Sequence, residues 1–320
     1  HMEKHKKISV IDPITPAWNH MVRILFKPFE FKKWLTLGFC AFLSQCTEGG
    51  GSGFNNFPTT GNTFPGMYGW IENNFSTFIT IACLALFAIL ALIFFVVWIS
   101  SRGKFMLIDG IVKNRGAISK PWNEYKREGN SLCLFSFGVM LLYIIVFVVL
   151  GAISFAIAIP DVQSQEFTGF GIAAIVVGSI FLLLYILASV FVAFFIKIFV
   201  IPAMYIKRIS AVEAWKIAWV ELHQPNRWSS VLLLLMMLLL SVGAGSIAMF
   251  ATCATCCIGA LPYVSSVLLL PIAVFFTCYS LCYIQQFGAE WTFFRNMCRF
   301  CSYDMQGLEE GHSCPECGKS

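Results

Sequence analysis

Charged residues are scarce in this chain of 320 residues. They make up 12% of the sequence, against about 25% in soluble domains, while hydrophobic residues make up 58%. A soluble fold has too little interior to cover that much apolar surface, so the composition excludes an ordinary soluble domain. Long uncharged runs separate the charged segments, and the sequence therefore predicts an all-α protein that crosses a membrane several times.

Signatures of catalysis are also missing. The sequence contains no Ser-His-Asp order, no phosphate-binding glycine loop and no pair of carboxylates inside an apolar run. Apart from His1, the histidines are His5, His20, His223 and His312, and they fall in tails or in charged connections. We therefore expect a protein that is not an enzyme.

About six apolar runs are candidates for transmembrane helices, and together they form a predicted helical bundle over residues 34–290. The runs are 34–46, 70–100, 131–160, 170–201, 231 to about 257, and about 264–287. A helix needs about 20 apolar residues to cross the hydrocarbon core. The first run is shorter than that, so it is either a short tilted span or a re-entrant hairpin.

Basic residues are absent from every connection on one predicted side of the membrane. All 22 fall before the first run, in a predicted loop between Arg102 and Asn130, between Lys197 and Arg227, or after Phe287. The opposite connections carry only acids, namely Glu48, Glu72, Asp161 and Glu166. Cytoplasmic loops hold the excess of Lys and Arg, so we expect a multi-pass protein of the bacterial inner (plasma) membrane with both termini in the cytoplasm.

The segment 1–33 mixes basic and aromatic residues, which is typical of a cytoplasmic interfacial segment on the inner leaflet. We take His1 as a vector residue, and we expect no cleavable signal peptide because no continuous apolar core follows Lys4–Lys7.

Residues 47–69 are polar and rich in glycine, which predicts a flexible loop, with a lid over an outer vestibule as the alternative.

A repeat of about 100 residues runs through the chain. Related amphipathic segments surround Trp18, Trp122 and Trp215, and each precedes a pair of apolar runs. This spacing indicates three units of interfacial helix plus transmembrane hairpin in the same orientation. The alternative is that any helix on the inner leaflet favours Trp and Ile.

Lys197 is the one basic residue inside an apolar run. Charges within a membrane mark functional sites by default. Lys197 is, however, only five residues before Pro202, so its side chain can also reach the inner interface as an anchor. We expect the anchoring role.

The strongest chemical motif lies at the end of the chain. Cys298 and Cys301 form one Cys-x-x-Cys pair, and Cys314 and Cys317 form a second. Two such knuckles supply the four thiolates that Zn²⁺ takes in closed structural sites, so we expect a cytoplasmic zinc ribbon over residues 296–320 with structural Zn²⁺ as its cofactor. A redox-active Cys314–Cys317 pair is the alternative.

The other nine cysteines lie in or near the apolar runs. Most read as small apolar residues inside helices. Cys253, Cys256 and Cys257 approach the outer face, where small residues that permit close helix packing are the expected role and a disulfide or a metal contact is the alternative.

Part of the sequence resembles a known group of proteins. The stretches Trp98–Asp109, Asn114–Trp122 and Tyr125–Ser131, with Ile8–Pro13 and Ile24–Phe29, are similar to an uncharacterised family of bacterial multi-pass membrane proteins. That family is loosely related to the membrane domain that precedes the catalytic barrel in some glycerophosphodiester phosphodiesterases. The resemblance covers roughly residues 8–290 and leaves no room for a barrel, so it implies a membrane module without catalysis.

Two functional hypotheses of different class follow. In the first, the zinc ribbon of a non-enzymatic membrane protein docks a cytoplasmic protein partner. In the second, the bundle is a transporter or lipid-handling protein with a structural zinc ribbon. The lipid bilayer is a partner in both, and a homo-oligomer is left open. Nucleic acid is not expected, because acids outnumber basic residues in the predicted ribbon.

Overall fold

The computed structural model describes residues 8–47, 74–164, 169–255 and 262–294, with residues 315 and 318. Every regular element in these ranges is a helix. The predicted all-α, multi-pass fold is confirmed, because several of these helices are long and apolar enough to cross a membrane.

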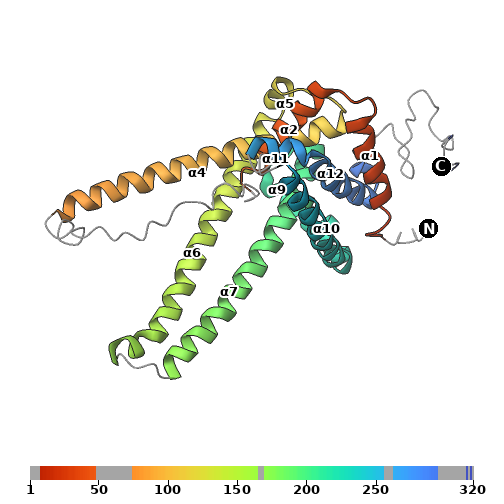
Figure 1. Cartoon of the computed structure of the whole chain (residues 1–320). Coiled ribbons are helices and arrows are strands. Elements are labelled where there is room, and N and C mark those ends of the chain that lie inside the picture. The colour runs from red at the N-terminus through yellow and green to blue at the C-terminus, as the bar shows by residue number, and fades with distance from the viewer. Residues whose placement is uncertain are drawn as a thin grey trace.

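Short helices gather in a compact hub, and long helices radiate from it (Figure 1). The hub contains α1 (Ile14–Phe26), α2 (Phe31–Gln45), α5 (Ser119–Glu124), α9 (Ala211–Ile217), α11 (Pro262–Leu268) and α12 (Leu270–Ile284). The radiating helices are α4 (Phe75–Val112), α6 (Lys126–Ser164), α7 (Gly169–Phe195) and α10 (Arg227–Ala254). Side chains such as Phe105, Phe199 and Tyr283 are fully buried in the hub, whereas the far parts of the long helices expose apolar residues, as lipid-facing helices do.

Five helical stretches in the described ranges are long and apolar enough to span a membrane. They are Phe75–Val112, Lys126–Asp161, Gly171–Lys207, Ala211–Ala254 and Leu270–Phe287. These stretches contain or overlap the second to sixth predicted crossings. The first predicted run forms α2, whose 15 residues extend only about 22 Å, less than the roughly 30 Å of a hydrocarbon core.

Helix α2 lies antiparallel to the end of α4 inside the hub. Ser100 donates a hydrogen bond to the carbonyl of Ser44 (3.0 Å), and Lys33 donates to the side chain of Asn114. A Cβ atom on Gly103 would lie 2.7 Å from the backbone nitrogen of Ser44. The two backbones can approach this closely because Gly103 has no side chain.

The segment from Arg102 to Asn130 is largely helical, and the prediction of a loop there is wrong. Helix α4 continues to Val112, and α6 begins at Lys126. The reason is that Phe105, Met106 and Ile108, which follow Arg102 and Lys104, are buried in the hub, so packing stabilises the segment as a helix despite its charge.

Helix α6 is longer than the apolar run 131–160. It continues past Pro160 to Ser164, so Asp161, which we expected in a connection between two runs, lies inside a helix. Asp161 accepts a hydrogen bond from the backbone nitrogen of Gly171 at 2.7 Å. This bond satisfies one of the unpaired N–H groups at the start of α7 and ties the two helices together.

Helix α7 continues without a break through the π-helical segment η1 (Ile196–Val200) into α8 (Ile201–Lys207). Pro202 has no N–H to donate, and its ring crowds the carbonyl four residues earlier. A wide π turn before the proline accommodates this geometry, and such turns often occur at functional sites. Lys197 lies within this turn.

The three predicted interfacial segments are all hub helices. Trp18 belongs to α1, Trp122 to α5 and Trp215 to α9, and α9 begins with a capping box between Ser210 and Glu213. Helices α5 and α9 lead into the long helices α6 and α10, but α1 leads into the short α2. A rotation that relates the three units stays a prediction.

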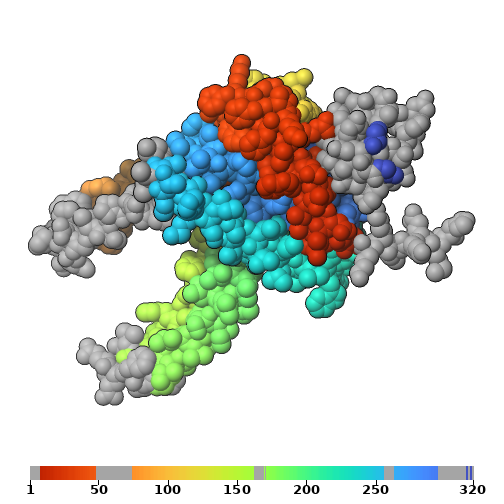
Figure 2. Space-filling model, turned by 45° about the vertical axis from the view of Figure 1, so that its right-hand side comes forward, coloured from red at the N-terminus to blue at the C-terminus, as the bar shows by residue number. Residues whose placement is uncertain are grey.

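The first and last described helices pack against each other. The N-terminal segment lies across the last helices in Figure 2. Gln286 exchanges two hydrogen bonds with the backbone of Ser9, at 2.9 and 2.8 Å, and Tyr279 donates to the carbonyl of Val10 at 2.8 Å. The hub is therefore closed by contacts between the two ends of the described chain.

Candidate functional site

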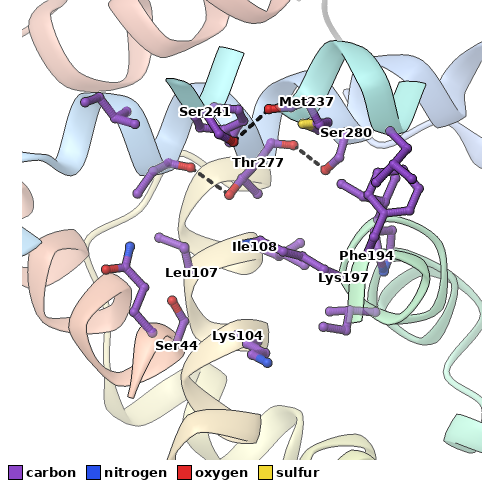
Figure 3. Close-up of a pocket in the computed structure, with 18 of the residues that line it drawn as sticks. Ser44, Lys104, Leu107, Ile108, Phe194, Lys197, Met237, Ser241, Thr277 and Ser280 are labelled. Carbon is purple, nitrogen blue, oxygen red and sulfur yellow. Dashed lines mark hydrogen bonds between the residues drawn. The ribbon is translucent and has the colours of Figure 1, made fainter. Parts of the chain in front are cut away.

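A cavity of about 430 Å³ lies where the hub meets the radiating helices. Its wall is built from α4, from the α7–η1–α8 rod, from α10 and from α12, and Ser44 and Gln45 at the end of α2 complete it. Figure 3 shows side chains from these elements pointing toward a common space. A concave site between helices of a bundle is a typical place for a ligand.

Most of the cavity wall is apolar because two helices each contribute one apolar face to it. On the α7–η1–α8 rod the lining residues Val190, Phe194, Ile198 and Ile201 recur at three- and four-residue steps. On α10, Leu234, Leu238 and Ser241 follow the same spacing. Residues at this spacing share one face of a helix, so each helix turns a continuous stripe toward the cavity.

Two lysines also line the cavity. Lys104 comes from the end of α4 and Lys197 from the π turn η1. Figure 3 shows both on the side of the cavity opposite Ser241 and Thr277. In the part of the chain that the structure describes, the residues lining this cavity include no Asp or Glu. The cavity therefore combines an apolar interior with cationic donors on one side.

Hydroxyl groups line the opposite side. Ser241 donates to the carbonyl of Met237 (2.7 Å), Thr277 to that of Ala273 (2.9 Å) and Ser280 to that of Thr277 (2.8 Å). Each hydroxyl hydrogen is thus engaged within its own helix, while the oxygen keeps lone pairs that can accept. These hydroxyl oxygens are therefore acceptors in the cavity wall.

Away from the hub, α7 and α10 diverge beyond the cavity. The buried residues of α10 are confined to its first part, at Ser230, Leu233 and Met237. Beyond them Leu238 is 50% exposed and Val242 is 69% exposed. Figure 1 shows α7 and α10 diverging away from the hub. An occupant of the cavity could therefore extend between the two helices into the surrounding bilayer.

A network of charges beside this cavity holds the hub together. Asp109 is fully buried and receives Arg115 Nε at 2.8 Å and Lys113 Nζ at 2.8 Å. The hydroxyls of Tyr125 and Tyr205 donate to the same carboxylate at 3.1 and 3.3 Å. A buried carboxylate is stable only when it is paired and hydrogen-bonded in this way. The network joins α4, α8 and Tyr125, which lies between α5 and α6.

Glu124 extends the network to the surface. The hydrogen bond from Lys113, together with the charge of Lys113 and the hydrogen bonds from Arg115 and Arg208, lowers the pKa of Glu124 to about 2. The guanidinium of Arg208 also lies 3.8 Å from the centre of the Tyr125 ring, a cation–π contact. The cluster is fully paired and partly exposed, so we interpret it as structural.

Arg102 occupies a second cationic position at the edge of the hub. Its guanidinium carbon lies 4.4 Å from the ring centre of Trp98 and 4.7 Å from that of Trp122. Its Nη2 donates to Asn130 at 3.0 Å. The sequence analysis counted Arg102 only as a topological charge, but the structure shows it clamped between α4 and α5.

The predicted zinc ligands Cys298, Cys301, Cys314 and Cys317 lie outside the described residues, so the zinc site stays a prediction. Within the described residues no cluster of three or more metal-ligating side chains occurs. The described cysteines are unpaired: Cys40, Cys46, Cys83, Cys133, Cys253, Cys278 and Cys282. Cys256 and Cys257 also lie outside the described residues.

Sequence reasoning found one of the two cavity lysines. Lys197 was noticed as a charge within an apolar run, and the structure places it in the cavity wall. Lys104 was assigned to a loop, because its neighbours Arg102 and Lys113 suggested a topological cluster. The helical spacing of Lys104, Leu107 and Ile108, which share the cavity-facing side of α4, is the signal that could have separated it from that cluster.

Comparison with known proteins gives a family and no function. Residues 8–289 match a family of unknown function, DUF7544. No curated protein and no solved structure matches the chain.

Proposed function

The chain belongs to DUF7544, a family of unknown function, and for this member we propose a lipid-handling role: the cavity binds an anionic amphiphile. The observation that supports this most directly is the pairing of an apolar wall with Lys104 and Lys197. An acyl chain gains free energy by burial against the apolar face, and an ammonium group forms a charge-assisted hydrogen bond with an anionic headgroup.

The position of the cavity supports a ligand from the bilayer. Lys197 is at the end of the apolar α7 stretch, next to the basic hub. A charged group at this depth lies near the headgroups of the leaflet on the hub side. Because α7 and α10 diverge away from the hub, the acyl chain can remain among lipid chains while the headgroup occupies the cavity.

Thermal unfolding of the purified protein in a neutral detergent tests this function. Because a ligand that binds only the folded state stabilises it, oleate should raise the unfolding temperature, whereas oleyl alcohol, with the same chain and no charge, should raise it less. The double variant Lys104→Gln/Lys197→Gln should lose the difference.

The matched control is Lys120→Gln, which removes an exposed lysine of α5 that is outside the cavity. This variant should retain the wild-type response to oleate. An equal effect of oleate and oleyl alcohol, or an undiminished oleate effect in the double variant, would contradict the proposal.

The cysteine spacing supports a second proposal. We infer that residues 296–320 form a structural zinc ribbon in the cytoplasm. We further infer that the protein is a non-enzymatic membrane protein and that this ribbon docks a protein partner. The two Cys-x-x-Cys pairs are its only support. The distant relation to the membrane domain of glycerophosphodiester phosphodiesterases also remains a proposal, carried by the sequence resemblance alone.

Elemental analysis of the purified protein tests the ribbon. We expect about one zinc per chain in the wild type and loss of zinc in Cys301→Ser, because three thiolates leave an open coordination position. Cys83→Ser, an exposed cysteine outside the motif, is the matched control. A metal-free wild type with a reversible Cys314–Cys317 disulfide would favour the redox alternative, and partner capture that survives deletion of residues 296–320 would reject docking.

A further inference from the structure

Three hydroxyl groups of the cavity wall share one chemical property. Ser241 of α10 and Thr277 and Ser280 of α12 line the cavity, and each donates its hydrogen to a carbonyl of its own helix. A hydroxyl group has one hydrogen to donate and two lone pairs that accept. Each of these oxygens can therefore accept a hydrogen bond from an occupant of the cavity, but it cannot donate one without breaking the bond within its helix.

The three acceptors come from two helices and face the same part of the cavity. Thr277 and Ser280 are three residues apart, so they share one face of α12. Figure 3 shows Ser241 of α10 on the same side of the cavity. Ser280 is only 4% exposed, and a hydrogen bond to a buried acceptor is stronger because bulk water does not compete for it.

An occupant that complements these oxygens carries hydrogen-bond donors. The oxygens of a carboxylate or an ionised phosphodiester only accept, so the donor must be an ammonium or a hydroxyl group elsewhere in the headgroup. An ammonium group that leaves water needs a counter-charge, and the described lining of the cavity includes no Asp or Glu. A hydroxyl group needs no counter-charge, and it is therefore the donor that suits this wall.

The size of the cavity suits a small headgroup. At the roughly 30 Å³ that one water molecule occupies in the liquid, the 430 Å³ cavity holds on the order of 14 non-hydrogen atoms. That volume accommodates a phosphodiester with a short polyol, but it cannot enclose a whole membrane lipid. The acyl chains of such a ligand therefore stay outside the cavity.

We propose that the cavity selects an anionic lipid whose headgroup carries alcohol hydroxyls, of the phosphatidylglycerol class, and that these hydroxyls donate to Ser241, Thr277 and Ser280. This inference rests on the proposed amphiphile binding and adds the class of the headgroup. The selection depends on the donors of the ligand and on the hydroxyl oxygens of the wall.

Native mass spectrometry of the full chain in detergent tests the headgroup preference. Dioleoyl phosphatidylglycerol and dioleoyl phosphatidylethanol share their chains and their phosphodiester charge, and only the first has free hydroxyls. We expect phosphatidylglycerol to bind about fivefold more tightly or better, because each neutral hydrogen bond changes an affinity by roughly two- to tenfold. Dioleoyl phosphatidylserine, whose donor is an ammonium group, should bind more weakly than phosphatidylglycerol.

The double variant Thr277→Val/Ser280→Ala removes two of the acceptors. It should reduce the affinity for phosphatidylglycerol to that for phosphatidylethanol and leave the affinity for phosphatidylethanol unchanged, whereas a general disturbance of the cavity would weaken both lipids. The matched control is Thr252→Val/Ser246→Ala, because these two hydroxyls also donate to carbonyls of α10, at 2.9 and 3.1 Å, but lie outside the cavity. The control should retain the preference, and circular dichroism establishes that both variants are folded.

The outcomes separate this inference from the proposed function. Equal binding of phosphatidylglycerol and phosphatidylethanol, weakened for both by Lys104→Gln/Lys197→Gln, would overturn the hydroxyl preference and leave amphiphile binding intact. Binding that is weak for every lipid and indifferent to the lysines would overturn both. A preference that survives in folded Thr277→Val/Ser280→Ala would overturn the role of these acceptors, and tighter binding of phosphatidylserine would overturn the hydroxyl as the donor.

Discussion

At the scale of single residues, buried polar groups show where the hub is most sensitive. His20 is 2% exposed and stacks on Phe294 with ring centres 4.1 Å apart. Its Nδ1 is buried without a hydrogen-bond partner. Burial, reinforced by the charge of Arg23, lowers the pKa of His20 from 6.5 to about 4. His20 is therefore harder to protonate in the folded protein than in the unfolded chain.

The pKa of His20 predicts a loss of stability in mild acid. The unfolded chain takes up the proton near pH 6.5 and the folded chain only near pH 4, so this contribution is fully present above pH 6.5 and falls away as the pH decreases toward 4. The difference amounts to about 3 kcal/mol. The unfolding temperature in detergent should therefore decrease between pH 7 and pH 4.5, and His20→Phe, which preserves the stacking, should decrease less. An identical decrease in both proteins would show that other groups are responsible.

Asp109 is the second sensitive residue. Replacement by Asn removes the charge that pairs with Arg115 and Lys113 and leaves these cations without their buried partner. Breaking a buried pair costs about 3–5 kcal/mol, so Asp109→Asn should lower the unfolding temperature strongly.

The matched control for Asp109→Asn is Glu221→Gln. The Glu221 side chain is 45% exposed and pairs with Lys207 at 3.1 Å, and an exposed pair is worth about 0–1 kcal/mol. Similar unfolding temperatures for the two variants would contradict the structural role of the Asp109 network.

At the scale of elements, the contact between α2 and α4 depends on Gly103. A Cβ atom there would lie within 2.8 Å of the backbone of Leu43 and Ser44, closer than real Cβ atoms approach backbone. We expect Gly103→Ala to separate the two helices and to destabilise the hub by about 1–3 kcal/mol, as overpacked sites do.

Gly138→Ala is the control for Gly103→Ala, because a Cβ atom at Gly138 in α6 meets nothing within 4 Å. The higher helix propensity of alanine should make this control neutral or stabilising by up to about 1 kcal/mol. Thermal unfolding of the two variants measures the difference. If Gly103→Ala were as stable as Gly138→Ala, the close approach of α2 and α4 would not exist.

The elements also show what sequence could and could not predict. Apolar runs from 70 to 287 predicted the long helices because a lipid environment forces such runs to be helical. The segment 102–112 was assigned to a loop because its charges were read before its apolar face. The cavity could not be predicted, since it depends on how the faces of α4, α7, α10 and α12 are turned toward one another. The pattern along a single helix identifies Lys197 or Leu234, but it cannot show that both line the same cavity.

At the scale of the whole molecule, the side of the membrane on which the hub lies stays a prediction. The structure places many of the basic residues in or near the hub, and the positive-inside rule then assigns the hub to the cytoplasmic side. Because helix α2 lies within the hub, the expected crossing by residues 34–46 does not support this assignment. The side of the membrane must therefore be measured directly.

Labelling of reporter cysteines in sealed membranes provides that measurement. A membrane-impermeant reagent applied from outside should modify a cysteine at Asn62 and spare one at Lys120, which is exposed in α5. After permeabilisation, the cysteine at Lys120 should react. Labelling at Lys120 from outside would reverse the topology.

The closure of the hub by its two ends sets an order of events during synthesis. Met21 and Leu25 of α1 are each 3% exposed, and α1 packs against α12, which ends at Ile284. A ribosome adds about 5–20 residues per second, so roughly 15 to 50 s pass between the synthesis of these two helices. Throughout that interval the apolar face of α1 lacks its partner and must be covered by lipid or by a chaperone. A nascent chain released before α12 is complete would therefore expose α1 and be a substrate for quality-control proteases.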